Sequence, residues 1–208
     1  MERRHFIKKT ALGVAGVAVA AAVPTGVMAI VNKNEKKKTN KTMKKILILN
    51  GSPRKNGRTA SLKNAFVEGA QSAGHEIKEY YLTGMNIRPC LACEYCQLHD
   101  GVCVQKDDMV EVTEAFGWAD VVVFVSPQFW GTISGQLKVV IDRLYAPLFK
   151  YGSEIKKEFV VIMTSRGDMY EMTEDFFRIF TKYLGWKNPG NILGGGKELQ
   201  AELLGASI

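Results

Sequence analysis

The feature that most constrains this chain is the alternation of short apolar runs with amphipathic stretches. The clearest run is VVVFVS at 121–126, in which five apolar residues follow one another. Such runs are typical of strands buried on both faces of a parallel sheet. Four other segments are predicted strands: KKILILN at 44–50, HEIKEYYL at 75–82, EFVVIMT at 158–164 and the short GNILGG at 190–195.

Between these runs the apolar residues recur every three or four positions, which predicts helices. Asp108 with Glu111, and Asp168 with Glu171, have the spacing of capping boxes, and Ser134 is a candidate N-cap. The inner face of the helix after Ser134 is expected to hold Leu137, Val140, Ile141 and Leu144. The inner face of the helix after Asp168 is expected to hold Met172, Phe176, Ile179, Phe180 and Tyr183.

Strands that alternate with helices favour an α/β fold with helices on both faces of the sheet. For five strands we predict a flavodoxin-like, doubly wound parallel sheet in the order 2-1-3-4-5. Residues 43–208 are expected to form this one domain. Ligands of such sheets bind at the carboxyl ends of strands beside the switch point, so the loops after the first, third and fourth strands should form the site.

The chain begins with a basic leader. Residues 1–42 hold nine Lys/Arg and two Glu, so they carry the whole net charge of +7, and residues 43–208 are balanced. A balanced body predicts no nucleic-acid partner. Residues 1–29 have a charged start and an Ala/Gly/Val run, which is typical of an export signal. The pair Arg3-Arg4, followed by HFIK, resembles a twin-arginine signal.

This leader predicts that the twin-arginine export machinery carries the folded protein to the periplasm or another extracytoplasmic location. Residues 30–42 then form a polar linker. An ordinary secretory signal is one alternative. An uncleaved leader that anchors the protein in the membrane is the other.

The first predicted loop, NGSPRKNGRTAS at 50–61, has the features of a phosphate site. Gly51 and Gly57 permit tight turns, Ser52 and Thr59 offer hydroxyls, and Arg54 adds a planar positive charge. The loop leads directly into a helix N-terminus, which favours an anion. It lacks the G-x4-G-K-[ST] spacing of NTP-hydrolysing P-loops. The neighbouring Arg58 is interpreted as a solvated side chain.

The other two loops offer a surface for a flat ligand. SPQFWGTISGQLK at 126–138 places Phe129 and Trp130 at the end of the central strand, where rings suit an aromatic ligand. Packing of both rings under the loop is the alternative. TSRGDMY at 164–170 adds polar groups and a glycine.

All four cysteines lie in CLACEYCQLHDGVC, with the spacing C-x2-C-x2-C-x6-C: Cys90, Cys93, Cys96 and Cys103. Short steps bring thiolates round a compact centre, as in bacterial ferredoxins, so we favour a 4Fe–4S cluster inserted before export. Zinc sites more often pair separated knuckles, and disulfides between neighbours close very small loops. Zinc, disulfides and free thiols nevertheless remain alternatives.

The stretches ILNGSPRKNGRT and SPQFWGTISGQLKVVIDR resemble the NADPH-dependent FMN reductase-like family of flavodoxin-fold proteins. The cysteine run followed by VQKDDM resembles the iron–sulfur flavoproteins within that family. The resemblance implies FMN with its phosphate at Ser52, Arg54, Asn56 and Thr59. It implies ring contacts from Ser126, Pro127, Gln128, Phe129, Trp130, Gly131, Ser165, Arg166 and Gly167.

Two further details concern the same resemblance. The family usually has tyrosine where this chain has Phe129, so one hydroxyl is missing. Asp142 and Arg143 match a D-R pair of the family and are interpreted as a structural ion pair.

The expected function is an FMN- and iron–sulfur-dependent oxidoreductase that takes electrons from NAD(P)H or a ferredoxin-like protein. The resemblance also implies a homo-oligomer, a dimer or tetramer, in which the cluster reaches the flavin across a subunit interface. No side chain is needed as a general acid, so no catalytic residue is predicted. The alternative is a non-catalytic electron carrier or flavin-binding protein whose cysteines form disulfides or bind zinc.

Overall fold

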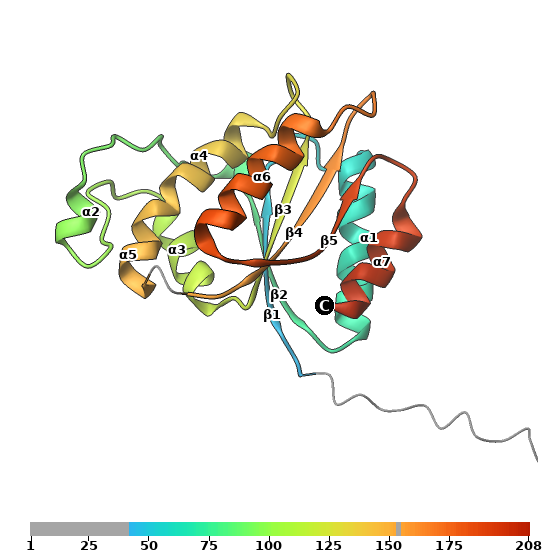
Figure 1. Cartoon of the computed structure of the whole chain (residues 1–208), viewed down its shortest axis with the longest axis horizontal. Coiled ribbons are helices and arrows are strands. Elements are labelled where there is room, and N and C mark those ends of the chain that lie inside the picture. Colours follow the sequence, from blue (N-terminus) through green and yellow to red (C-terminus); the bar gives the residue numbers. More distant parts are fainter. Residues whose placement is uncertain (1–41, 153–154) are drawn as a thin grey trace, which may run out of the picture. The chain divides into compact units, whose positions relative to one another are not determined.

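The computed structural model describes residues 42–152 and 155–208 (Figure 1). The predicted signal and nearly all of the predicted linker, including Arg3 and Arg4, lie outside these residues. Within the described ranges, no helix is long and apolar enough to cross a membrane.

Five strands form one sheet in the order β2-β1-β3-β4-β5, and every neighbouring pair is parallel. The predicted fold class is confirmed. In the central strands Ile48 lies opposite Val123, and Val123 lies opposite Val160. The strands are β1 (Lys45–Asn50), β2 (Glu76–Tyr81), β3 (Val121–Pro127), β4 (Glu158–Thr164) and β5 (Lys187–Leu193).

Helices cover both faces of the sheet (Figure 1). Helices α1 and α7 pack on one face, and α3, α4 and α6 lie over the other. The helical elements are α1 (Arg58–Ser72), the 3-10 turn η1 (Leu82–Gly84), α2 (Tyr95–Leu98), α3 (Met109–Trp118), α4 (Gly135–Arg143), α5 (Tyr145–Tyr151), α6 (Glu171–Leu184) and α7 (Glu198–Ser207).

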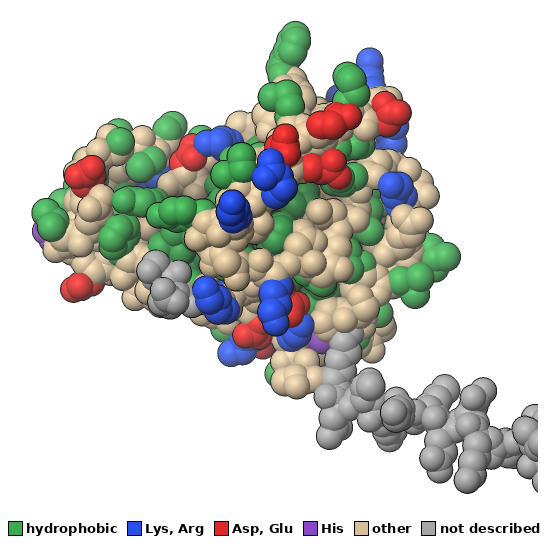
Figure 2. Space-filling model, viewed as in Figure 1, with side chains coloured by type: hydrophobic (Ala, Val, Ile, Leu, Met, Phe, Trp, Pro, Cys, Tyr) green, Lys and Arg blue, Asp and Glu red, His purple; other side chains and the backbone are tan. Residues whose placement is uncertain are grey.

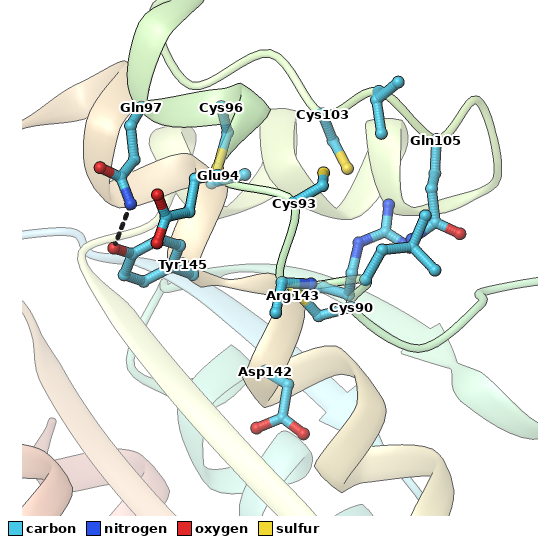
Figure 3. Close-up of a pocket in the computed structure, with 14 residues that line it drawn as sticks. Cys90, Cys93, Glu94, Cys96, Gln97, Cys103, Gln105, Asp142, Arg143 and Tyr145 are labelled. Carbon is cyan, nitrogen blue, oxygen red and sulfur yellow. Dashed lines mark hydrogen bonds between the residues drawn. The ribbon is translucent and has the colours of Figure 1, made fainter.

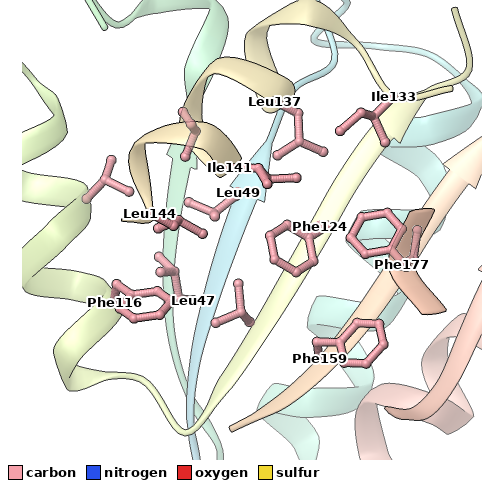
Figure 4. Packing of buried hydrophobic residues seen from close by; sticks show 14 of the residues in the cluster. Leu47, Leu49, Phe116, Phe124, Ile133, Leu137, Ile141, Leu144, Phe159 and Phe177 are labelled. Carbon is pink, nitrogen blue, oxygen red and sulfur yellow. The ribbon is translucent and has the colours of Figure 1, made fainter. Parts of the chain in front are cut away.

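Side chains alternate along each strand and so build two separate cores. Leu47 and Phe124 point toward α3, α4 and α6, where the larger core lies (Figure 4). Ile48 and Val123 point the other way, toward Phe66 of α1. All five of these side chains are fully buried. Because the central strands are buried on both faces, their sequences read as unbroken apolar runs.

Both predicted capping boxes are wrong, whereas the predicted N-cap is confirmed. The Asp108 carboxylate accepts the backbone N–H of Asn86 at 2.7 Å, outside its own helix. Helix α6 begins at Glu171, three residues after Asp168, and carries no side-chain cap in the described structure. Ser134 does cap α4, since its Oγ accepts the N–H of Leu137 at 3.4 Å.

The four predicted inner residues of α4 are buried, although α4 ends at Arg143 and a separate helix, α5, follows. The predicted inner face of α6 is only partly confirmed, since Phe176 and Phe180 pack against the larger core but the other three predicted residues do not. Ile179 and Tyr183 are 61% and 83% exposed, and Met172 is exposed as well. Phe177 is buried instead, because its ring packs against that of Phe124 with centroids 5.1 Å apart.

Candidate functional site

The three predicted loops meet in one pocket of about 410 Å³ at the carboxyl ends of β1, β3 and β4. The sheet order brings them together, because β1, β3 and β4 are neighbours. The pocket is lined by Ser52, Pro53, Arg54, Gly57, Arg58, Thr59, Pro127, Gln128, Phe129, Trp130, Gly131, Thr164, Ser165 and Arg166. We refer to it below as the switch-point pocket.

The β1–α1 loop forms the polar side of this pocket. The Ser52 hydroxyl donates to the Arg54 carbonyl at 3.1 Å and accepts the Arg54 N–H at 3.3 Å, which fixes the turn. Helix α1 starts after Gly57 and, in the described structure, has no side-chain cap. Its first N–H groups are therefore left for a ligand, and a helix N-terminus favours phosphate. The hydroxyls of Thr59 and Thr164, 2.5 Å apart, join this loop to β4.

The β3–α4 loop forms the aromatic side. Phe129 and Thr132 exchange backbone hydrogen bonds of 2.8 and 3.1 Å, and the Gln128 amide donates to the carbonyl of Met169 at 2.5 Å. Trp130 sits at the tip with a left-handed φ of 50° and is fully exposed. Phe129 is 44% exposed. The alternative that both rings pack under the loop is therefore wrong, and a planar ligand can reach them.

Three predicted contact residues do not line this pocket. Ser126 is buried beneath the loop, where its hydroxyl accepts the N–H of Ser134 at 2.8 Å. Gly167 lines a different cavity, beside Asp168, and Asn56 is exposed to solvent. Ser126 therefore supports the loop rather than touching a ligand.

Four lining residues were not predicted as contacts: Pro53, Gly57, Arg58 and Thr164. Thr164 ends β4 and lies opposite Pro127 of β3, so its strand-end position could have identified it. Arg58 is the first residue of α1 and is exposed, as its interpretation as a solvated side chain predicts, but it also lines the pocket.

The four cysteines line a second cavity of about 410 Å³, here named the cysteine cavity (Figure 3). They come from the segment between η1 and α3, and Arg143 and Tyr145 close the cavity from α4 and α5. All four are free cysteines. In residues 42–152 and 155–208, no three His, Cys, Asp or Glu side chains are grouped closely enough to form a metal site. The cysteine and switch-point cavities share no lining residue.

The cysteines nevertheless influence one another. Burial raises the pKa of the Cys96 thiol, a hydrogen bond with its own backbone opposes this, and the charges of Cys103, Cys90 and Cys93 raise it further. Cys96 therefore lies within electrostatic reach of the other three thiols.

The backbone that carries the cysteines is strained. Ala92, Glu94 and Asp100 have left-handed φ values of 50°, 56° and 49°. Strain of this kind persists where the surrounding structure imposes it, often at ligand sites. Four sulfur donors on one cavity wall are the ligand types of an iron–sulfur cluster or of zinc, although the described side chains are not grouped closely enough to form a metal site.

Arg143 lies buried beside the cysteines and is paired with Asp107. Its Nη1 and Nη2 donate to the two carboxylate oxygens of Asp107 at 2.8 and 3.0 Å. The predicted Asp142–Arg143 ion pair is wrong, since Asp142 pairs with Lys138 at 2.6 Å. Consecutive helix residues point about 100° apart, so the two side chains diverge.

Two known archaeal proteins are similar in sequence to this chain. An iron-sulfur flavoprotein of Methanocaldococcus jannaschii is 33% identical over 124 residues, which cover 60% of this chain and 62% of that protein. An iron-sulfur flavoprotein of Archaeoglobus fulgidus is 34% identical over 119 residues, which cover 54% and 53%. The chain thus spans less than two thirds of the length of these relatives.

A solved structure shares the fold. The NAD(P)H:quinone oxidoreductase from Methanothermobacter marburgensis superposes with a TM-score of 0.61 at 22% identity, over 80% of this chain and 96% of that one. The family model for NADPH-dependent FMN reductase matches residues 44–197, a span that includes both cavities. The chain therefore belongs to the NADPH-dependent FMN reductase family, which is a family of oxidoreductases.

Proposed function

We propose that the protein is a two-centre flavoprotein that transfers electrons from NAD(P)H through FMN to a 4Fe–4S cluster. The observation that carries this proposal is the convergence of Cys90, Cys93, Cys96 and Cys103 on one cavity in a member of an FMN reductase family. The printed names of the two archaeal relatives, iron-sulfur flavoproteins, support it.

FMN suits the switch-point pocket on both of its sides. The phosphate would lie at the N-terminus of α1, beside the hydroxyls of Ser52 and Thr59, where Arg54 and Arg58 supply positive charge. The flavin ring would lie against Trp130. Bound FMN supplies the conversion between two-electron and one-electron transfer, and the chain's own residues bind and orient it.

The four cysteines would hold the cluster outside the sheet, where a bulky group displaces no core residue. Ligand thiols must be deprotonated, so the burial that raises the pKa of Cys96 opposes ligation until metal binding displaces its proton. Zinc would use the same four sulfurs, so metal analysis distinguishes the two.

The donor, acceptor and location belong to the same proposal. NAD(P)H is the proposed donor because the family is NADPH-dependent, and a ferredoxin-like protein is the alternative. We propose export through the twin-arginine machinery after cofactor insertion, on the strength of Arg3-Arg4 and the apolar run that follows. If NAD(P)H drives no turnover with any quinone, metal or oxygen acceptor, a pure electron carrier is the better description.

Cofactor content after anaerobic purification tests the proposal. We expect bound FMN, with about four iron and four acid-labile sulfide per chain. Cys96→Ser should remove iron and sulfide but leave FMN bound, because the two cavities share no lining residue. Zinc in place of iron, or protein that takes up no FMN on reconstitution, would refute the proposal.

A further inference from the structure

Arg143 has a buried N–H group, that of Nε, for which the described residues supply no acceptor with regular hydrogen-bond geometry. Its side chain is 2% exposed, and its two Nη atoms are engaged by Asp107 and by the carbonyl of Arg88. In the described structure its Nε is buried and has no hydrogen-bond partner. Buried donors in native proteins are almost always paired, so an unpaired one on a cavity wall indicates a missing acceptor.

Arg143 lines the cysteine cavity (Figure 3). Burial on its own lowers the pKa of Arg143, but hydrogen bonding to Asp107 and Cys103 and the charges of both residues raise it above its ordinary value. The guanidinium is therefore permanently positive and lies beside the Cys103 sulfur.

The guanidinium is also fixed in position, because its hydrogen bonds join the two ends of the cysteine segment, residues 88–107. Arg143 donates to the Arg88 carbonyl at 2.7 Å, and Asp107 accepts the Arg88 N–H at 3.0 Å. At the next residue of the segment, the Pro89 carbonyl accepts a hydrogen bond of 2.9 Å from the side-chain amide of Gln105. These bonds hold the two ends of the segment side by side, so Cys90 and Cys103 face one cavity.

We propose that Arg143 is a positioning residue for the cluster, holding Cys103 in place and stabilising the negative charge that the cluster gains on reduction. The inference rests on the proposed function, because it requires a cluster. Reduction adds one electron, from the flavin or a chemical reductant, and forms or breaks no bond. A fixed positive charge in a poorly solvated site favours the more negative state, and hydrogen bonds to cluster sulfurs act in the same direction.

The test is a redox titration of the cluster in the full chain, followed by electron paramagnetic resonance with dithionite as reductant. In Arg143→Gln, the ratio of reduced to oxidised cluster at a fixed solution potential should fall about tenfold, which is 59 mV for a one-electron couple. Arg143→Lys keeps the charge and should stay much closer to wild type. Arg178→Gln is the matched control, since it removes an arginine from an exposed ion pair with Asp175 on α6 and should change nothing.

An Arg143 that only stabilises the fold would change the unfolding midpoint but leave the potential of the bound cluster unaltered, and that result overturns the inference. If Arg143→Gln does not fold, Asp107→Asn takes its place. That change removes the buried carboxylate and should move the ratio in the opposite direction, and an unchanged ratio again overturns the inference. Wild-type protein without iron refutes the proposed function itself, whereas a cluster of unchanged potential in Arg143→Gln refutes only the role of Arg143.

Discussion

Trp130 stands out among the individual residues because nothing in the fold requires it. It is fully exposed, it occupies a left-handed φ of 50°, and it lines the switch-point pocket. Left-handed backbone is unfavourable for a bulky residue, whereas asparagine tolerates it well. A side chain that costs stability and buries no surface in the free protein is best explained by a ligand.

We therefore expect Trp130→Asn to weaken FMN binding without destabilising the protein. Loss of one aromatic contact, worth about 0.5–1.5 kcal/mol, should raise the Kd for FMN about 2- to 13-fold. Fluorescence titration of the apoprotein measures the Kd, and urea unfolding should show no loss of stability. Leu203→Asn is the control, because Leu203 is 61% exposed on α7 and lies outside both the switch-point pocket and the other cavities of the described structure. Equal Kd values for wild type and Trp130→Asn would contradict this role.

The sequence locates the site residues that directly follow the ends of strands. It does not locate the residues whose hydrogen-bond partners are set by tertiary packing. Ten of the thirteen predicted flavin contacts line the switch-point pocket, because turn residues after parallel strands gather at one edge. Ser126 could not be excluded from the sequence, since only the fold shows its hydroxyl bonded to the N–H of Ser134. The partner of Arg143 was hidden as well, because Asp107 is 36 residues away along the chain.

Among the elements, the sequence predicts best those whose apolar pattern fits only one placement in the fold. The strands β1, β3 and β4 each contain an unbroken apolar run of at least four residues and were correctly placed. Helix α6 carries apolar residues on two adjacent faces, so its periodicity fits two orientations, and contact of Phe177 with Phe124 selects between them. The capping box predicted at Asp108 failed because tertiary structure offers its carboxylate another donor, the distant backbone N–H of Asn86.

The docking of the cysteine segment on α5 depends on Gly101. This residue has a φ of 73°, and a Cβ built there would overlap the backbone of Ala146 and Lys150. Gly101→Ala should therefore displace the segment, with overpacking that costs about 1–3 kcal/mol, and should lower the iron content while FMN stays bound. Urea unfolding and iron analysis measure the two effects.

The matched control is Gly74→Ala. Gly74 also has a positive φ, 84°, but a Cβ there would meet nothing within 4 Å. It should show only the cost of left-handed backbone, about 1–2 kcal/mol, with a normal iron content. If both variants keep their iron, close packing of the cysteine segment on α5 is not what shapes the cavity.

For the whole molecule, the sheet topology explains the switch-point pocket but does not connect it with the cysteine cavity. The two cavities share no lining residue, and the cysteine segment projects from the sheet beside α5 (Figure 1). Hydrophobic side chains gather on the surface over α2 and α5 (Figure 2). A groove of about 670 Å³ contains Tyr145, Phe149 and Tyr183, and Tyr145 also lines the cysteine cavity. Exposed apolar surface of this kind is typical of protein interfaces.

We expect the protein to form a dimer or tetramer through this groove. The flavin bound to one subunit would then pass electrons to the cluster in the cysteine cavity of another. The double change Phe149→Glu and Tyr183→Glu should then give a monomer, because two carboxylates would be buried in the interface. The monomer should keep its iron and FMN, and stopped-flow mixing with NADPH should show flavin reduction without rapid cluster reduction. Leu199→Glu with Leu203→Glu, on α7, is the control, since these residues are also exposed (68% and 61%) but lie outside the groove. Light scattering gives the mass of each variant. A wild-type protein that is monomeric and still shows rapid cluster reduction would rule out electron transfer between subunits.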